Sequence, residues 1–148
     1  RHLFTYAGEG EYITPGHSRK VVEFRGVRIM LQVCYDLRFP VFVRNRDDYD
    51  MIIYVASWPI ARKIAWNTLI RARAIENQCY VAAVNRVGVD QFGVYSGDSV
   101  LISPYGENVV VAEESKVDMV SAELDMDKLN HFREKFPVLD DADTYMYM

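Results

Sequence analysis

The chain has 148 residues and a net charge of −4, and its 50% hydrophobic and 26% charged content is typical of a globular domain with a sizeable core. Acidic and basic residues are interspersed, so nothing predicts a nucleic-acid or anionic-membrane partner. No apolar run approaches the roughly 20 residues that a membrane-spanning helix needs. Two cysteines are too few for a disulfide framework. Because reduced cysteines are typical of cytoplasmic proteins, we expect a cytoplasmic location.

Apolar β-rich runs and stretches with helical periodicity follow one another along the chain. The predicted strands cover residues 21–24, 27–33, 51–56, 79–84, 99–103 and 108–112, with a weaker one at 117–124. Arg25-Gly26 predicts a tight turn between the first two strands. The predicted helices cover residues 60–78 and 126–136, the second capped by Asp125 and ended by Pro137. This mixture indicates a layered α/β fold.

Cys34 follows a buried strand and enters a polar, charged turn. The carboxyl end of a strand is where α/β folds bind their ligands, and the N–H groups of a following turn can stabilise a thiolate or an oxyanion. The position therefore fits a nucleophile. It fits a core cysteine equally well, because free cysteines are among the most buried residues.

Segments along nearly the whole chain resemble, in the same order, motifs of the nitrilase (carbon–nitrogen hydrolase) superfamily, and more narrowly of its bacterial omega-amidase branch. They are Arg1-His2-Leu3-Phe4, Gly8-Glu9, Thr14-Pro15-Gly16, Leu31-Gln32-Val33-Cys34-Tyr35-Asp36-Leu37-Arg38-Phe39-Pro40, Tyr54-Val55-Ala56-Ser57-Trp58-Pro59, Arg71-Ala72-Arg73-Ala74-Ile75-Glu76-Asn77-Gln78, Asn85-Arg86-Val87-Gly88, Gly97-Asp98-Ser99, Pro104-Tyr105-Gly106-Glu107 and Arg133-Glu134-Lys135-Phe136-Pro137.

The resemblance implies a four-layer α-β-β-α sandwich and a Glu–Lys–Cys catalytic triad. In the family the lysine directly precedes the segment that matches Arg1-His2-Leu3-Phe4, and the glutamate lies further upstream. We therefore expect residues 1–148 to be the C-terminal portion of a single carbon–nitrogen hydrolase domain, with two triad members outside it. The fragment alone is expected to be inactive.

The implied activity is hydrolysis of the terminal amide of a small ω-amido dicarboxylate, such as α-ketoglutaramate, to the acid and ammonia. A thioester on the cysteine is the expected intermediate. Two alternatives stay open at this point. One is another amidase or a carbamoyl-amine hydrolase of the same superfamily, and the other is a non-catalytic binding or scaffold protein.

The resemblance assigns catalytic roles to three residues. Cys34 is the nucleophile, and the backbone N–H of Tyr35 is an oxyanion donor. Glu9 matches a second family glutamate that orients the lysine or assists proton transfer, with Glu11 as the alternative. Read without the resemblance, Glu9 is an ordinary exposed acid in a glycine-rich loop.

Further polar and aromatic residues lie beside the predicted site. Arg38 suits a substrate carboxylate or a structural ion pair, and Asp36 favours the structural role. Trp58 follows a buried strand and either walls the pocket or only packs. Arg73 and Glu76 are three residues apart on the predicted helix, a spacing typical of pairs on helix surfaces.

A Cys–His protease is a rival for any lone nucleophilic cysteine, with His17 as the candidate base. Cys79 opens a buried strand and is predicted to be a core residue. No cofactor is implied, and no metal-ligand spacing is present. The family resemblance also implies a homodimer or higher homo-oligomer. Residues after Asp140, with the aromatic tail 143–148, are either an interface segment or a poorly ordered terminus.

Overall fold

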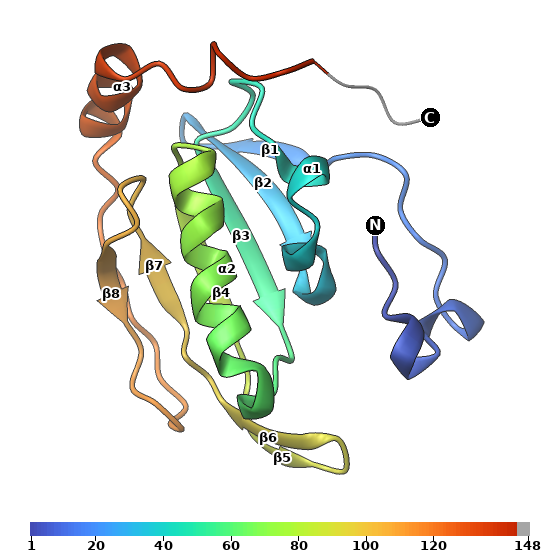
Figure 1. The fold of residues 1–148 in the computed structure, drawn as a ribbon. Helices are drawn as coiled ribbons and strands as arrows, with labels where there is room; N and C mark the ends of the chain where they lie inside the picture. Colours follow the sequence, from blue (N-terminus) through green and yellow to red (C-terminus); the bar gives the residue numbers. More distant parts are fainter. Residues whose placement is uncertain (145–148) are drawn as a thin grey trace.

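The computed structural model describes residues 1–144, and these form a six-stranded sheet in the order β1-β2-β3-β4-β7-β8 beside a two-stranded hairpin, β5-β6 (Figure 1). The strands are β1 (Val21–Phe24), β2 (Val27–Val33), β3 (Met51–Ala56), β4 (Tyr80–Asn85), β5 (Val87–Asp90), β6 (Gly93–Ser96), β7 (Val100–Ile102) and β8 (Asn108–Val111). The helices are α1 (Pro40–Val43), α2 (Lys63–Glu76) and α3 (Met126–Lys135), with short 3₁₀ turns η1 (Thr5–Ala7), η2 (Glu9–Glu11), η3 (Cys34–Arg38) and η4 (Ile60–Arg62). The predicted α/β fold is confirmed.

The centre of the sheet is parallel. β2 pairs with β3 and β3 with β4 in parallel register, whereas β1, β7 and β8 join antiparallel. The predicted turn at Arg25-Gly26 is confirmed, with φ of 51° and 78° at its two residues. Such positive φ values produce the twist that a two-residue hairpin needs. Because three parallel strands end at one edge, the segments that follow them lie close together.

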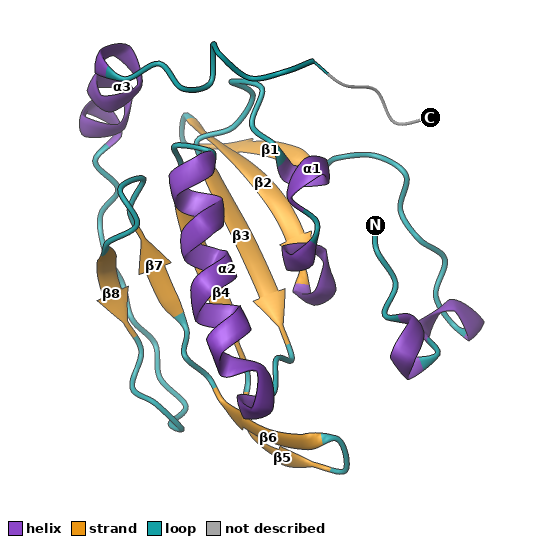
Figure 2. Cartoon of the chain, in the orientation of Figure 1, coloured by secondary structure: helices purple, strands orange, loops and turns teal. Residues whose placement is uncertain are grey.

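Helix α2 covers one face of the sheet, as Figure 2 shows. Its inward side chains Trp66, Ile70 and Ala74 pack on Ile52 and Val81 of the central strands, and all five are at most 1% exposed. This is the main core, and it holds the carboxyl ends of the strands in place. None of the helices within residues 1–144 is long and apolar enough to cross a membrane.

The opposite face of the sheet is apolar and exposed. Val33, Val55 and Val84 are neighbours across β2, β3 and β4, and they are 61%, 48% and 52% exposed. Leu31 adds to the same face and is 42% exposed. The continuous β-rich runs predicted strands buried on both faces, but among residues 1–144 only the face under α2 is covered, and the second apolar face is exposed.

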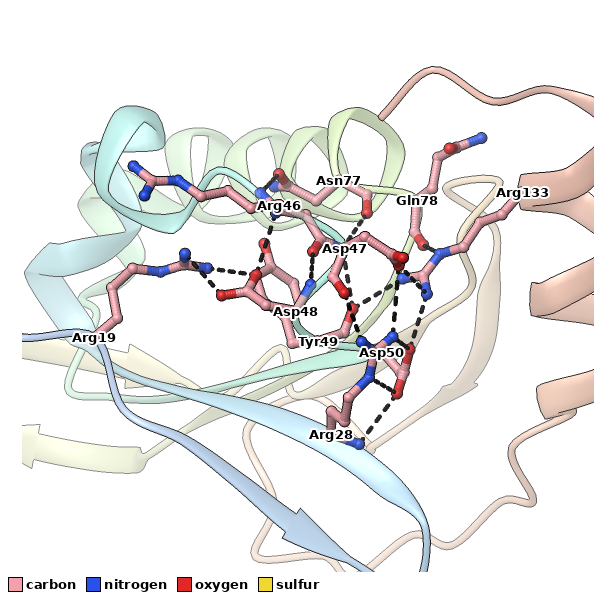
Figure 3. Close-up of polar contacts among 11 residues, drawn as sticks. Arg19, Arg28, Arg46, Asp47, Asp48, Tyr49, Asp50, Asn77, Gln78 and Arg133 are labelled. Atoms are coloured by element: carbon pink, nitrogen blue, oxygen red, sulfur yellow. Dashed lines mark hydrogen bonds and ion pairs between the residues drawn. The ribbon is translucent and has the colours of Figure 1, made fainter. Parts of the chain in front are cut away.

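A network of charged residues fastens α3 to the end of the sheet (Figure 3). Asp50, which precedes β3, accepts hydrogen bonds from Arg28 of β2 at 2.6 and 2.9 Å and from Arg133 of α3 at 2.8 Å. Arg133 also donates to the backbone oxygens of Tyr49 and Gln78. Burial raises the pKa of the Asp50 carboxyl, but the bonds from the two arginines outweigh it and the net pKa is lowered.

Most predicted elements are confirmed, with boundaries that shift by one or two residues, but the short helix α1 was not predicted and some other elements differ. Residues 117–124 form no strand and are mostly exposed, so that prediction is wrong. The hairpin β5-β6 was not predicted. The predicted helix 60–78 begins as the 3₁₀ turn η4 and ends at Glu76. Asp125 does cap α3, accepting from the backbone N–H of Lys128 at 2.8 Å. The predicted interface tail falls partly outside the described residues, which end at 144.

Candidate active site

A cavity of about 750 Å³ lies at the carboxyl edge of the parallel strands. The N-terminal segment, the turn η3 after β2 and the loop after β3 contribute its lining. The structure places all five sequence-predicted site residues on this cavity. They are Glu9, Cys34, Tyr35, Arg38 and Trp58.

Cys34 is half-buried and has a φ of 42°, a left-handed conformation that is unusual for a residue with a side chain. Such strain is concentrated at functional sites. Its Sγ lies 3.9 Å from the backbone oxygen of Ser57. Burial is the main reason that the pKa of the Cys34 thiol is raised; the charge of Glu9 adds to this and that of Arg62 opposes it. The thiol therefore needs a base before it can attack a carbonyl carbon.

The turn that carries Cys34 is held by Asp36. Its carboxylate accepts from the backbone N–H of Val33 at 3.3 Å and from both the backbone and the ring of His2 at 2.9 Å. Burial raises the pKa of Asp36, but the bonds from His2 outweigh it and the net pKa is lowered. Asp36 thus has the structural role, and its partner is His2 rather than Arg38.

Tyr35 contributes its backbone to the site. It is the second residue of η3, where an N–H group has no acceptor inside its own turn and is available to a ligand. Its ring packs away in an aromatic cluster, 4.9 Å from the Phe4 ring and 5.1 Å from the Phe39 ring. The geometry fits the predicted backbone role, for which the phenol is not required.

Glu9 lies in η2 and is partly buried. Its Oε2 accepts a hydrogen bond from the backbone N–H of Phe4 at 2.7 Å, which fixes the carboxylate at the cavity. Glu11 is exposed and lies outside the cavity lining. Of the two predicted candidates, only Glu9 is therefore placed to act on Cys34.

Trp58 forms a buried wall, with 4% of its surface exposed. The guanidinium carbon of Arg38 lies 5.0 Å from the centre of its ring, within the range of a cation–π contact. Asn85, at the end of β4, holds the Trp58 backbone from both sides: it accepts from Trp58 N at 2.7 Å and donates to Trp58 O at 3.0 Å. Asn85 was not among the predicted site residues, although its position as a polar residue at the end of a buried strand is a signal that the sequence carries.

Comparison with known proteins agrees with this geometry. The family model "Carbon-nitrogen hydrolase" matches residues 1–134. The chain belongs to the carbon–nitrogen hydrolase family. It is 51% identical to "Omega-amidase YafV" of Yersinia enterocolitica over 100% of its own length and 58% of the relative's. It is 36% identical to "2-oxoglutaramate amidase" of Bacillus subtilis, over 99% of its length and 57% of that relative's.

One solved structure aligns over the whole chain. XC1258 from Xanthomonas campestris, described as a CN-hydrolase superfamily protein with an arsenic adduct in its active site, is 44% identical with a TM-score of 0.95. The alignment covers 100% of this chain and 59% of that one. This carbon–nitrogen hydrolase chain thus spans less than two thirds of the length of each of these three proteins.

In this carbon–nitrogen hydrolase, Arg73 does not lie on the helix surface, where its spacing from Glu76 predicted it. It does pair with Glu76, at 2.9 Å, but its side chain is buried, with 3% of the residue exposed. Its Nη2 donates to the backbone oxygen of Leu37 at 2.6 Å. Because Leu37 belongs to η3, the central helix α2 directly supports the turn of Cys34. Three-residue spacing predicted the pair but not its burial.

The remaining candidates lie elsewhere. His17 is exposed and outside the cavity lining, and Cys34 forms no hydrogen bond to a histidine among residues 1–144, so the geometry does not support a Cys–His pair. Cys79 is fully buried, and burial raises the pKa of its thiol far above the ordinary range. The predicted core role of Cys79 is confirmed. The described part of the chain contains no group of three acidic, histidine or cysteine residues placed to hold a metal ion.

Proposed function

We propose that this protein hydrolyses the terminal amide of a small ω-amido dicarboxylate, such as α-ketoglutaramate, to the acid and ammonia. The observation that carries the proposal is a cysteine in a strained conformation, at the mouth of a cavity, on the carboxyl edge of a parallel sheet. The names of the omega-amidase and 2-oxoglutaramate amidase relatives support this substrate class.

In the proposed reaction the Cys34 thiol loses its proton to a base and its sulfur attacks the amide carbon. The tetrahedral intermediate collapses, its C–N bond breaks, and nitrogen leaves as ammonia after taking up the proton. Water then attacks the thioester, releases the acid and returns the proton to sulfur. The Tyr35 N–H stabilises the oxyanion in both steps.

The family resemblance assigns the base to a glutamate and further oxyanion stabilisation to a lysine. No lysine lines the described cavity, and we assign neither role to a residue of this chain. We propose that Glu9 orients such a lysine or relays a proton, because its carboxylate is fixed at the cavity and its charge acts on Cys34. Arg38 and Trp58 are proposed to bind the substrate.

The test measures ammonia release from α-ketoglutaramate by the full gene product and by Cys34→Ala. We expect the substitution to abolish release without changing the far-ultraviolet circular dichroism. Mass spectrometry of the wild type, quenched during turnover, is expected to find an acyl adduct on Cys34 and none on Cys79. Full activity in Cys34→Ala, or an adduct on Cys79, would reject the nucleophile.

The same assay separates the alternatives. A wild type that releases ammonia from carbamoyl amines but not from α-ketoglutaramate has the activity of another branch. A wild type that forms no adduct with any amide acts as a binding or scaffold protein. We further propose a homodimer, as the resemblance implies, in the cytoplasm, the location that unpaired cysteines favour. Light scattering that gives a monomer at micromolar concentration would contradict the dimer.

A further inference from the structure

Arg62 is a cation on the Cys34 cavity whose role neither the motifs nor the predicted site explained. Within residues 1–144 its guanidinium forms no hydrogen bond or ion pair, and its carbon lies 5.7 Å from the centre of the Phe4 ring. The neighbouring Lys63 is different, because its Nζ contacts carboxylates of Asp98 and Glu114, each at 2.7 Å. The charge of Arg62 is thus available to a ligand, whereas that of Lys63 is already neutralised.

The backbone of Arg62 is fixed relative to the cavity wall. Its N–H donates to the backbone oxygen of Pro59 at 2.9 Å, and its own oxygen accepts from the Trp58 indole at 2.8 Å. Arg62 also directly precedes the first residue of α2, where the helix dipole favours an anion. The side chain is therefore anchored at its base and exposed at its charged end.

The charge of Arg62 also reaches the reacting atom. It lowers the pKa of the Cys34 thiol against burial and against the negative charges of Glu9 and Asp36. Asp36 is already occupied by His2, and Glu9 by the backbone of Phe4. A guanidinium beside the nucleophile, with no carboxylate partner of its own, is suited to bind the carboxylate of an incoming substrate through two parallel hydrogen bonds.

We propose that Arg62 is a specificity-determining residue that binds the carboxylate of the substrate while its amide carbon faces Cys34. The cavity then selects anionic amides over uncharged amides of the same length. Two more arginines line the cavity: the guanidinium of Arg38 lies on the Trp58 ring, and that of Arg1 lies on the Phe42 ring. This inference rests on the proposed amidase function and adds the residue that sets its substrate class.

The first test compares kcat/KM for glutaramate, an anion, with that for pentanamide, its uncharged counterpart of equal length. Arg62→Gln is expected to lower the glutaramate-to-pentanamide ratio of kcat/KM by roughly 10- to 100-fold, the effect of one lost charge-assisted contact. Any change in the thiolate fraction of Cys34 affects both substrates and cancels in the ratio. Arg62→Lys should retain part of the preference, because it keeps the charge but loses the planar fork.

Arg25→Gln is the matched control, because it removes the same charge from an exposed turn outside the cavity lining. Its ratio should equal that of the wild type. An Arg62→Gln ratio equal to that of the wild type overturns the proposal. So does an equal fall of the ratio in Arg25→Gln, which would indicate only an effect of net charge.

A binding test separates this inference from the proposed activity. Glutarate should slow alkylation of Cys34 by iodoacetamide in the wild type and in Arg25→Gln, but not in Arg62→Gln, with protected and unprotected rates compared within each variant. If no amide releases ammonia but protection still requires Arg62, the amidase function fails and the anion site stands. If protection is unchanged in Arg62→Gln, the anion site is wrong.

Discussion

Arg73→Met tests how strongly helix α2 supports the nucleophile turn. The substitution replaces the arginine stem, out to the position of Nε, by an unbranched apolar side chain and removes the rest of the guanidinium, in a site where Arg73 is 3% exposed. It removes the hydrogen bond from Nη2 to the backbone oxygen of Leu37 and the ion pair with Glu76. Leu37 is fully buried, so its carbonyl is left without a polar partner.

The expected cost follows from these contacts. Leaving a buried carbonyl unpaired costs about 1–3 kcal/mol. The Glu76 side chain is 35% exposed, so loss of its ion pair adds no more than about 1 kcal/mol. The Nε of Arg73 has no partner, and removing this buried group offsets part of the loss. We therefore expect a net destabilisation of about 2 kcal/mol, or roughly 4–8 °C in Tm for a protein of this size.

Thermal denaturation followed by circular dichroism measures the shift, and initial rates measure the effect on Cys34. We expect kcat to fall more than KM rises, because the turn that carries the thiol loses a support while the cavity walls remain. Glu76→Gln is the control: it removes the ion pair but leaves the bond to Leu37, so its Tm should fall by less than half as much. Equal shifts in the two variants would show that the ion pair, and not the bond to the turn, is what matters.

Three further predictions concern other contacts. Asp50→Asn should lower the free energy of unfolding by about 2 kcal/mol at neutral pH. Because the folded-state pKa of Asp50 is lowered, its contribution is present above the unfolded pKa of about 4 and is lost as the pH falls through the folded pKa, so urea melts of wild type and variant should converge in acid. Gly106→Ala should lower Tm, because Gly106 has a φ of 83° and an added Cβ would lie 2.7 Å from Cδ1 of Ile75; Ile75→Ala should restore part of the loss. Asn85→Asp places a carboxylate against the backbone oxygen of Trp58 and should raise KM and lower Tm, whereas an unchanged Tm would contradict the bracing role of Asn85.

The elements that sequence patterns predicted correctly are those whose cause is local. The run at 51–56 is apolar throughout, and the run at 27–33 is apolar except at Arg28 and Gln32, so each favours a strand from its own composition. The cap at Asp125 is a contact between residues three apart. The incorrect strand at 117–124 shows the limit of local reasoning, because a weak alternation does not by itself supply a neighbouring strand to pair with.

The five predicted residues of the site could be identified from the sequence, but the contacts that hold them in place could not. Cys34 and Trp58 each follow a buried strand, and parallel strands bring such positions to one edge. The partners of these residues lie far away in sequence. His2 binds Asp36 across 34 positions, and Arg73 binds Leu37 across 36. No periodicity within a single element encodes pairings of that kind.

The strained backbone of Cys34 explains why these distant contacts matter for the proposed reaction. A residue with a side chain at positive φ costs about 1–2 kcal/mol, so the conformation persists only where neighbouring contacts impose it. Asp36 binds the residue before Cys34, and Arg73 binds the turn after it. The sequence around Cys34 supplies the thiol, but partly buried His2 of the N-terminal segment, through Asp36, and buried Arg73 of α2 impose its orientation. It follows that a substitution at Arg73, which lies outside the cavity lining, should impair the nucleophile without touching the cavity where the substrate is proposed to bind.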